Sequence, residues 1–407
     1  MKNLLKIQEF IRANNDWEAK LQEKPYCITI SRDVVHGREL VMFKYSQIDS
    51  DFMNEIVREC RGLILDAQNF EIVSCPFFKF GNVGEAYCPE IDWKSCYVTE
   101  KLDGSLIKIV NLGGELLLST NGTIDAFKAP LAEQIGCVAK SFGELAWYAI
   151  LENYRRDQGL NNSDCIDPDV VKGWMLKTFK EGYTYMFELT SPFNKVVVTW
   201  HQTKLSFIGC RDNLTCRELF FGDHELVKVF DTPKIFPLHS IDECVKAASE
   251  LDVNSEGYVV VDKDFNRVKV KSPQYVALHH MRNNGVLSFE RGLEIVRGNE
   301  LAEVLTYFPE FTEHLNKIKE DFDVWTQSLR SSEAAFNEWL KSNGYADRHW
   351  LVEASGANRK NAAIWIQKNF KIPGLGFALL DAKAASADDW IASIPSAKLV
   401  RMLGYKD

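Results

Sequence analysis

The hydrophobic residues of the first 276 positions fall into short runs, some alternating with polar residues and some continuous. Such runs, when Gly, Asn or Pro bound them, are typical of β-strands. Apolar residues at every third or fourth position predict helices at the start of the chain and over 131–154, 214–230 and 240–251. The pattern predicts strands over residues 27–31, 40–45, 62–66, 97–101, 106–110, 115–120, 184–189, 195–200, 204–209, 257–262 and 267–271.

The pattern changes at about residue 277, where strand-like runs stop. Apolar residues then recur at helical spacing, with few β-branched clusters, over 301–305, 311–340 and 362–370. We therefore expect a mixed domain of helices and strands over residues 1–276 and an all-helical domain over residues 277–407. Gly, Pro and Asn clusters predict loops near residues 161–164, Gly344, Gly356 and Pro373-Gly374.

Length and hydropathy place limits on the architecture and the location. The 407 residues suggest two or three domains at a prior of about 150 residues each. No apolar run approaches the roughly 20 residues that a membrane span requires. The opening residues mix charged and apolar positions, unlike the continuous apolar region of a signal peptide. We expect a cytoplasmic protein without a membrane segment.

Charge and cysteine usage exclude some classes of protein. The formal charge of −9 argues against a broad basic surface that coats nucleic acid, although it leaves room for a local basic groove. The ten cysteines include no Cys-x-x-Cys pair and no Cys/His cluster with zinc spacing. Reduced, buried thiols are the expectation.

Lys101, in Thr-Glu-Lys-Leu-Asp-Gly-Ser, is the first candidate for chemistry. Lys-x-Asp-Gly after a strand is how covalent nucleotidyltransferases present a lysine to ATP. A lysine attacks phosphorus only as a neutral amine, which nearby cations and desolvation favour. Lys269 and Lys271 alternate on one predicted strand and would share a face. The alternatives are a solvated edge strand for these two lysines and a simple hairpin turn at Asp103-Gly104.

Three carboxylates are candidates for supporting Mg²⁺, directly or through its water shell. Asp103 follows Lys101, Glu188 lies within a predicted strand, and Glu256 immediately precedes another. Taken singly, each is also explained as a surface residue or a salt-bridge partner. Arg61 and Lys79 could bind phosphate, Arg through its planar fork and Lys as a point charge.

The order of several motifs changes this picture, because together they resemble the RNA ligase 1 family, whose prototype is the tRNA-repairing ligase of T-even bacteriophages. The resemblance covers roughly residues 30–276. The motifs are Glu-Cys-Arg-Gly at 59–62, Lys-Phe-x-Asn at 79–82, Lys-x-Asp-Gly-Ser at 101–105, Phe-Glu-x-x-x-Pro-x-Asn-Lys-Val-Val at 187–197, Glu-Gly-Tyr-Val at 256–259 and Lys-x-Lys-Ser at 269–272.

The resemblance implies an α+β adenylyltransferase domain with antiparallel sheets and helices, followed by an all-helical C-terminal domain that reads RNA or tRNA. Lys101 would attack the α-phosphorus of ATP and carry AMP. The AMP would pass to an RNA 5′-phosphate and be displaced by a 3′-hydroxyl, as in repair of nicked tRNA. Mg²⁺, or Mn²⁺ in its place, would be held by Asp103, Glu188 and Glu256. The family's pattern implies ATP contacts from Arg61, Lys79, Glu100, Lys101, Gly104, Glu188, Gly257, Lys269, Lys271 and Tyr275.

The resemblance further implies a monomer that acts in the host cytoplasm, if the chain is phage-encoded. Two positions depart from the family's pattern. Asn121 stands where a lysine usually precedes Gly122, and Gly81 stands where an aromatic residue is expected. One phosphate contact and one packing contact are therefore in question.

Two other readings stay open. DNA ligases and mRNA-capping enzymes share the lysine chemistry, but they usually have arginine where this chain has Leu106, and a strand-rich domain follows in them. A catalytically silent RNA-binding protein or interaction module could also keep the fold. In the tail, the basic residues Arg359-Lys360 and Lys368 to Lys371, beside Trp365 and Phe370, could bind structured RNA or simply form a solvated helix face.

Overall fold

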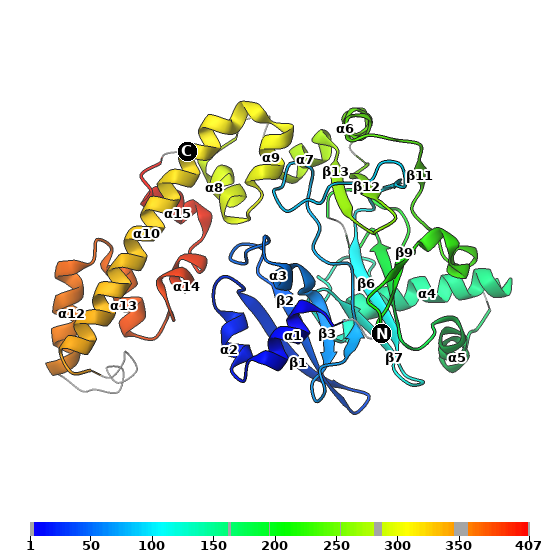
Figure 1. Cartoon of the computed structure of the whole chain (residues 1–407), viewed down its shortest axis with the longest axis horizontal. Helices are drawn as coiled ribbons and strands as arrows, with labels where there is room; N and C mark the ends of the chain where they lie inside the picture. The colour runs from blue at the N-terminus through cyan, green and yellow to red at the C-terminus, as the bar shows by residue number, and fades with distance from the viewer. Residues whose placement is uncertain are drawn as a thin grey trace. The chain divides into compact units, whose positions relative to one another are not determined.

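A computed structural model describes residues 4–161, 164–194, 196–252, 254–280, 287–345 and 357–405 (Figure 1). The chain divides into two compact units, residues 1–279 and residues 280–407. The first unit combines helices with antiparallel sheets, and every regular element described in the second is helical. The predicted α+β class with a helical C-terminal region is confirmed.

The first unit contains three antiparallel sheets within the described residues. The first sheet has the order β1-β2-β3-β4: Ile28–Val35, Arg38–Tyr45, Arg61–Asp66 and Ile72–Ser74. The second has the order β10-β9-β8-β6-β7: Glu218–Leu219, Lys204–Asp212, Tyr183–Thr190, Ser105–Asn111 and Leu116–Thr120. The third has the order β11-β5-β12-β13: Ile235–Phe236, Tyr97–Glu100, Gly257–Val261 and Arg267–Lys271.

Alternation along the strands divides the core of the first unit into layers. On β6, Ile107 and Ile109 pack against the helices on one face, while Val110 joins a cluster with Leu40 and Met42 of the first sheet. Each of the two faces of the second sheet thus buries apolar side chains against a different layer. The helices around the sheets are α1 (Lys6–Ala13), α2 (Trp17–Gln22), α3 (Glu55–Glu59), α4 (Phe142–Gln158), α5 (Pro168–Thr178), α6 (Ile241–Ser249) and α7 (Pro273–His280).

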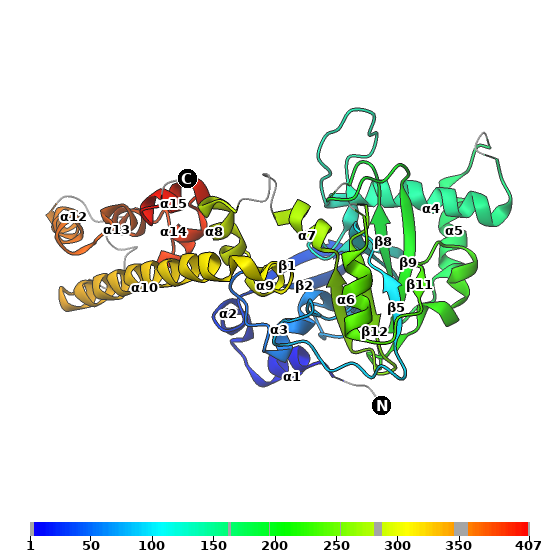
Figure 2. The ribbon, with the colours of Figure 1, turned by 90° about the horizontal axis from the view of Figure 1, so that it is seen from above.

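The helices that cover the second and third sheets have clear local signals. Ser141 caps α4 by accepting a hydrogen bond from the Glu144 N–H, and Gly159 ends the helix in the left-handed region. Helix α6 begins in the same way at Ser240 and lies along the third sheet, as Figure 2 shows. These helices shield one face of each sheet and leave the strand ends near Lys101 accessible.

The second unit is built around the long helix α10 (Thr312–Ser342). Leu329, Phe336 and Leu340 of this helix belong to the buried core of the unit, together with Ile366. The other helices are α8 (Phe289–Arg297), α9 (Leu301–Tyr307), α12 (Ala357–Asn369), α13 (Pro373–Leu380), α14 (Ala387–Ala392) and α15 (Ser396–Met402). Among the described residues, no helix is long and apolar enough to span a membrane.

Several local predictions are wrong. Residues 196–200 form no strand, because the Val197 and Val198 N–H groups donate to the Asp103 carboxylate instead of to a neighbouring strand. The predicted helix at 214–230 is β10 followed by two short 3-10 turns, since Phe220 packs on Tyr97 with ring centroids 4.4 Å apart. Residues 131–141 are irregular, and α4 begins only at Phe142.

Other predictions are refined or lie beyond what the structure describes. Pro373-Gly374 opens α13 instead of forming a loop, consistent with the preference of Pro for the first helical turn. All ten cysteines are free thiols, as expected, but the expected burial holds fully only for Cys60, Cys75, Cys210 and Cys244. Five others are half-buried, and Cys165 is exposed. Asn162, Ser163, Lys195 and Gly356 lie outside the described residues.

Candidate active site

The chain crosses from the third sheet to the second at Lys101. Strand β5 ends at Glu100, residues 101–104 have no regular structure, and β6 begins at Ser105 in a different sheet. The two strands therefore do not pair, and the hairpin interpretation of Asp103-Gly104 is wrong. Their divergence opens a pocket of about 590 Å³, within the usual size of ligand sites.

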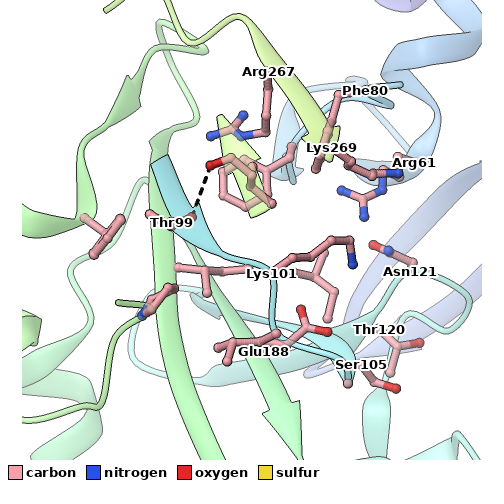
Figure 3. A pocket seen from close by; sticks show the side chains of 18 of the residues that line it. Arg61, Phe80, Thr99, Lys101, Ser105, Thr120, Asn121, Glu188, Arg267 and Lys269 are labelled. Atoms are coloured by element: carbon pink, nitrogen blue, oxygen red, sulfur yellow. Dashed lines mark hydrogen bonds between the residues drawn. The ribbon is translucent and has the colours of Figure 1, made fainter. Parts of the chain in front are cut away.

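The pocket collects candidates from distant parts of the sequence (Figure 3). Arg61 comes from β3, Glu188 from β8 and Lys269 from β13, while Lys101 lies at the crossing. In Figure 3 the ends of the Arg61, Lys101, Glu188 and Asn121 side chains face a shared space. Of the residues that the sequence singles out, the pocket lining includes Arg61, Glu100, Lys101, Gly104, Glu188 and Lys269.

Lys101 is fixed at both its backbone and its side chain. Its N–H donates to the Gly257 carbonyl at 2.8 Å, and its Nζ lies 2.5 Å from Oε1 of Glu256. The lysine side chain is 21% exposed, but the glutamate is only 5% exposed. The sequence-based expectation emphasised surrounding cations, yet the structure places a carboxylate in direct contact with the amine.

The hydrogen bond from the Lys101 N–H to the Gly257 carbonyl depends on a glycine at position 257, because only glycine fits there. Its φ is +137°, and an added Cβ would lie 2.2 Å from the Val270 carbonyl oxygen. Gly104 is similarly confined, since a Cβ there would lie 2.3 Å from the Leu189 carbonyl oxygen. The backbone on both sides of Lys101 is therefore packed too closely to accept a side chain at these two glycines.

Asp103 holds the crossing segment in place. Its Oδ2 accepts hydrogen bonds from the Val197 and Val198 N–H groups at 2.9 and 2.7 Å, and its Oδ1 accepts from the Tyr275 hydroxyl at 2.9 Å. Trp200 Nε1 donates to the Asp103 carbonyl at 2.8 Å. Both carboxylate oxygens thus already bind donors, and Asp103 acts here as an anchor for the loop.

Lysine and arginine side chains gather around Lys269, on one side of the pocket. Burial lowers the pKa of Lys269 well below its ordinary value, and Lys79, Lys101, Arg61 and Lys271 lower it further. Like charges gathered in this way favour binding of an anion, which relieves their mutual repulsion.

The Phe80 ring, which the sequence-based reasoning missed as a functional residue, packs within this cluster. Its centroid lies 4.7 Å from Lys269 Nζ, 5.4 Å from Arg61 Cζ and 5.5 Å from Arg267 Cζ. An aromatic face attracts cations, so one ring helps to hold three of them together. The signal available in the sequence was an aromatic residue next to a candidate lysine, which on its own is too common to be diagnostic.

Unpaired polar atoms also face this region. Arg61 Nη1, Asn121 Oδ1 and Glu256 Oε2 are buried and have no hydrogen-bond partner among the residues that the structure describes. Buried polar atoms without partners are rare in folded proteins, and each costs free energy. A ligand with anionic oxygens to accept from Arg61 and with N–H or O–H groups to donate to Asn121 and Glu256 would satisfy these atoms, and a nucleotide has both kinds of group.

Burial disfavours the ionised form of Glu188, which lines the pocket, and of Glu256, which contacts Lys101. Burial raises the pKa of Glu188 to about 7, with Lys101 opposing and Glu256 adding to that shift. Burial also raises the pKa of Glu256, against the effect of Lys101 and Lys271. Within the described parts of the chain, no group of three or more His, Cys, Asp or Glu residues is arranged to hold a metal ion. A metal here would need oxygen ligands from water or substrate in addition to Glu188 and Glu256.

Six candidates are not among the residues that line the pocket, namely Lys79, Asp103, Glu256, Gly257, Lys271 and Tyr275. Lys79 Nζ donates to Gln47 Oε1 at 3.2 Å and lies 4.6 Å from the Phe52 ring centroid. Lys271 Nζ lies 5.8 Å from the ring centroid of Tyr275, the same tyrosine that anchors Asp103. Gly257 and Glu256 act through Lys101, as described above. Glu100 lines the pocket, but its Oε1 accepts a hydrogen bond from the Lys234 N–H.

A buried ionic network supports the pocket wall and could not be read from the sequence. Glu218 of β10 binds Arg211 of β9 and Arg267 of β13, with 2.8 Å between Arg267 Nη2 and Glu218 Oε2. All three side chains are at most 8% exposed. Arg267 lines the pocket, and its Cζ lies 4.1 Å from the Phe77 ring centroid. The network ties the second sheet to the third beside the candidate site.

Lys108 is a fully buried lysine on β6, the strand that begins beside the pocket at Ser105. Its Nζ donates to the Gly62 carbonyl at 2.5 Å, and Gly62 has no room for a Cβ because the Asn121 Cα would lie 2.8 Å away. Lys108 therefore holds the start of β3, which carries Arg61, against the turn that carries Asn121. Burial lowers the pKa of Lys108 to about 7; Cys75 opposes this shift and Arg61 adds to it.

This shift predicts a specific pH dependence for the variant Lys108→Met. Below about pH 7 both the folded and the unfolded protein hold the Lys108 proton, so the full cost of burying the charge is present. Between about pH 7 and the ordinary pKa of 10.5 the unfolded chain holds more protons, so Lys108 destabilises the fold less as pH rises. Replacing Lys108 with Met should change the unfolding free energy more favourably at pH 6.5 than at pH 9.5. We expect the two changes to differ by roughly 1–3 kcal/mol.

Urea unfolding of both proteins at both pH values measures this double difference. Groups present in both proteins, such as Lys269 and Glu188, contribute equally to the pH dependence of the two unfolding free energies, so their contributions cancel. An identical difference at the two pH values would show that Lys108 titrates normally.

Some of the basic and aromatic residues of the tail make contacts within the second unit. Arg359 pairs with Asp381, Phe370 is buried, and Trp365 stacks on Phe336 with 5.6 Å between ring centroids. Helix α12 ends at Asn369, so Lys371 lies beyond it. Lys360, Lys368 and Lys371 are exposed, and the aromatic residues belong to the core rather than to a free surface.

Comparisons of the sequence with known proteins match this chain to RNA ligases. A family model described as RNA ligase matches residues 59–275. A protein of Autographa californica nuclear polyhedrosis virus named "Putative bifunctional polynucleotide kinase/RNA ligase" is 30% identical over 287 residues, covering 67% of this chain and 38% of that protein. An RNA ligase of Rhodothermus phage RM378 is 24% identical over 358 residues, covering 72% of this chain and 75% of that protein.

A solved structure of an archaeal ATP-dependent RNA ligase aligns with 13% identity and a TM-score of 0.42, covering 81% of this chain and 83% of that one. The chain thus spans well under half of its viral relative and most of its phage relative.

Proposed function

This chain belongs to the RNA ligase family, and we propose that it joins RNA 3′-hydroxyl and 5′-phosphate ends at the expense of ATP. The observation that carries the proposal is the position of Lys101: its amine lies in a pocket with cations on one side and the Glu256 carboxylate 2.5 Å away. A nucleophile, a proton acceptor and an anion-binding cluster are the parts that transfer of a nucleotidyl group to lysine requires.

In the first step, Lys101 attacks the α-phosphorus of ATP. The amine must lose a proton, and Glu256 Oε1 is already within hydrogen-bond distance to take it. The raised pKa of Glu256 makes it a better proton acceptor than an ordinary carboxylate. The bond from the α-phosphorus to the bridging oxygen breaks, pyrophosphate leaves, and AMP remains on the Lys101 nitrogen.

Arg61 and Lys269 are placed to stabilise the charge that develops on the phosphate oxygens. Lys79 and Lys271 would reinforce this cluster electrostatically or contact the leaving pyrophosphate. Asp103, Tyr275, Gly104 and Gly257 would keep the lysine in register with its target, since small displacements of a nucleophile are costly. Glu100 and Asn121 line the pocket and would contact the nucleotide.

Two further phosphoryl transfers complete the proposed reaction. An RNA 5′-phosphate oxygen attacks the phosphorus of the lysine-bound AMP and releases Lys101, which regains its proton. A 3′-hydroxyl oxygen then attacks the activated RNA phosphate, expelling AMP and forming the phosphodiester. A bound Mg²⁺, or Mn²⁺ in its place, would neutralise phosphate charge, with Glu188 and Glu256 and intervening waters as its supports.

A sealing assay with the full chain tests this proposal. We expect a linear RNA with 5′-phosphate and 3′-hydroxyl ends to become circular only when ATP and Mg²⁺ are both present. The matched control is the same RNA with a 5′-hydroxyl, which cannot accept AMP and should stay linear. Joining of nicked DNA but not of RNA would instead identify a DNA ligase, and binding of RNA without joining would identify a silent relative.

The finer proposal is repair of nicked tRNA by a cytoplasmic monomer, with residues 280–407 reading the tRNA. The exposed Lys360, Lys368 and Lys371 support an RNA contact, and the phage relative supports a phage origin. A chain that ends at His279 should still join linear RNA at near wild-type rates, but should lose roughly tenfold in sealing a nicked anticodon loop. Equal losses on both RNAs would remove the tRNA-specific role, and gel analysis of the two products decides between them.

A further inference from the structure

Two cysteines that the proposed reaction does not use are in contact behind the pocket. Cys75 follows β4 directly and is fully buried, whereas Cys216, in the link between β9 and β10, is partly exposed. A hydrogen bond joins their side chains. The two residues are far apart in the sequence, so this pairing is a product of the fold.

Cys75 also contacts a buried cation. Arg211 Nη1 lies 3.3 Å from the Cys75 sulfur and donates to the Pro76 carbonyl at 2.8 Å. Burial opposes ionisation of Cys75, but the hydrogen bond from Cys216 and the Arg211 charge outweigh it and lower its pKa below the ordinary thiol value. The same hydrogen bond raises the pKa of Cys216. These opposite shifts fit a hydrogen bond in which Cys216 is the donor and the Cys75 sulfur is the acceptor.

Charge balance in the buried network gives an independent reason for a thiolate. Arg211 and Arg267 share a single carboxylate, Glu218, and all three side chains are almost completely enclosed. Two positive charges against one negative charge would leave a buried surplus of one, which is expensive. A negative Cys75 sulfur beside Arg211 makes the network neutral.

The network ends at the pocket wall. Arg267 lines the pocket and packs on Phe77 and Phe80, with 4.1 and 5.5 Å from its Cζ to the two ring centroids. In Figure 3 Arg267, Phe80 and Lys269 form the side of the pocket opposite Glu188. Arg211 and Glu218 therefore connect Cys75 to Arg267, which lines the pocket.

We propose that Cys75 and Cys216 form an oxidative modification site, at which a small hydroperoxide closes a disulfide that weakens nucleotide binding through Arg211, Glu218 and Arg267. The effect on nucleotide binding rests on the proposed function, because it assumes that the pocket binds ATP. Formation of the disulfide does not depend on the proposed function. Thiolate character, a partly exposed sulfur and an adjacent second sulfur are the features of an oxidisable pair.

The oxidation balances with hydrogen peroxide as the oxidant. The shared proton moves to Cys75 as the sulfur of the partly exposed Cys216 attacks one peroxide oxygen. The O–O bond breaks, and the departing hydroxide takes the Cys75 proton to give water. The Cys75 thiolate then attacks the Cys216 sulfenic sulfur, the S–O bond breaks, and hydroxide leaves as a second water with a proton from solvent. In total one thiol and one thiolate lose two electrons, and one peroxide, with the shared proton and one proton from solvent, becomes two waters.

The disulfide would remove the Cys75 thiolate, one of two negative partners of Arg211, and would leave Glu218 as the other. Arg211 would then compete more strongly with Arg267 for Glu218, and Arg267 would be less firmly held against Phe77 and Phe80. We expect ATP to bind roughly fivefold more weakly to the oxidised protein, which is a typical coupling between two linked sites.

Peptide mapping of the full chain tests the modification site itself. The protein is treated with one equivalent of hydrogen peroxide, alkylated and digested without reduction. A peptide that links Cys75 to Cys216 is expected in wild type and in the control variant Cys165→Ser, which removes an exposed cysteine elsewhere, but not in Cys216→Ser. If Cys75 and Cys216 remain alkylatable while Cys165 is oxidised, the proposal is wrong.

Calorimetric titration with ATP tests transmission to the pocket. Oxidised wild type should bind ATP about fivefold more weakly than reduced wild type, dithiothreitol should restore binding, and peroxide should leave the affinity of Cys216→Ser unchanged. Equal affinities before and after a mapped disulfide would overturn the transmission. If ATP binds neither form, the proposed function fails, and the peptide map alone decides whether the thiol pair is a modification site.

Discussion

Replacing Lys101 with alanine should abolish transfer of label from α-labelled ATP to the protein. The side-chain nitrogen that would receive AMP is lost, and with it the amine that lies 2.5 Å from Oε1 of Glu256. We expect a decrease of at least about a thousandfold, as for removal of other covalent nucleophiles. Gel electrophoresis after incubation with labelled ATP and Mg²⁺ measures the protein-bound AMP.

Two further variants separate chemistry from folding. Lys101→Arg keeps a positive charge opposite Glu256 but cannot act as the nucleophile at neutral pH, so it should be as inactive as the alanine variant. Lys177→Ala removes an exposed lysine from α5 and should label like wild type. Label that persists on Lys101→Ala would refute the assignment of this lysine.

Replacing Glu218 with alanine should cost about 3–5 kcal/mol of unfolding free energy. The substitution leaves the guanidinium groups of Arg211 and Arg267 buried without their shared carboxylate. Removing one member of a buried ion network is far more costly than the network's net contribution, because the remaining charges stay desolvated. Urea unfolding followed by tryptophan fluorescence measures the change.

The matched control is Glu152→Ala, which breaks an exposed pair with Arg155 on α4. This surface pair should contribute no more than about 0.5 kcal/mol. A small effect of Glu218→Ala, similar to that of the control, would mean that water or a neighbouring group replaces the lost carboxylate. The network could not then hold Arg267 against the pocket wall in the way described above.

Much of the secondary structure was predictable because it depends on local periodicity. The strands that contain Leu63, Ile107 and Val259 follow the alternating or continuous apolar patterns that predicted them. Long helices such as α10 also follow from apolar spacing. The errors fall where a tertiary contact replaces the local preference: the Val197 and Val198 N–H groups bind Asp103, and Phe220 turns towards Tyr97.

The sequence also singled out Arg61, Lys101, Glu188 and Lys269, which the structure brings to one pocket. Their roles stay predictions until the variants above are measured. Lys108 and Glu218 were missed, because a lysine within a strand or a lone glutamate has no distinctive local pattern. Phe80 lies in the Lys-Phe-x-Asn motif, but the motif assigned no role to its ring. Their importance comes from what surrounds them: three cations on one ring, complete burial, and two guanidinium groups on one carboxylate.

The sequence by itself determined the family resemblance, the α+β class with a helical C-terminal region, and Lys101 as the candidate nucleophile. These depend on residue order and on spacing within short segments, which the chain carries directly. Only the tertiary structure decided that β5 and β6 belong to different sheets, that Glu256 contacts the Lys101 amine, and that Tyr275 binds Asp103 from 172 positions away. Such pairings arise from the packing of distant segments, and periodicity within one segment contains no information about the partner that burial will place beside it.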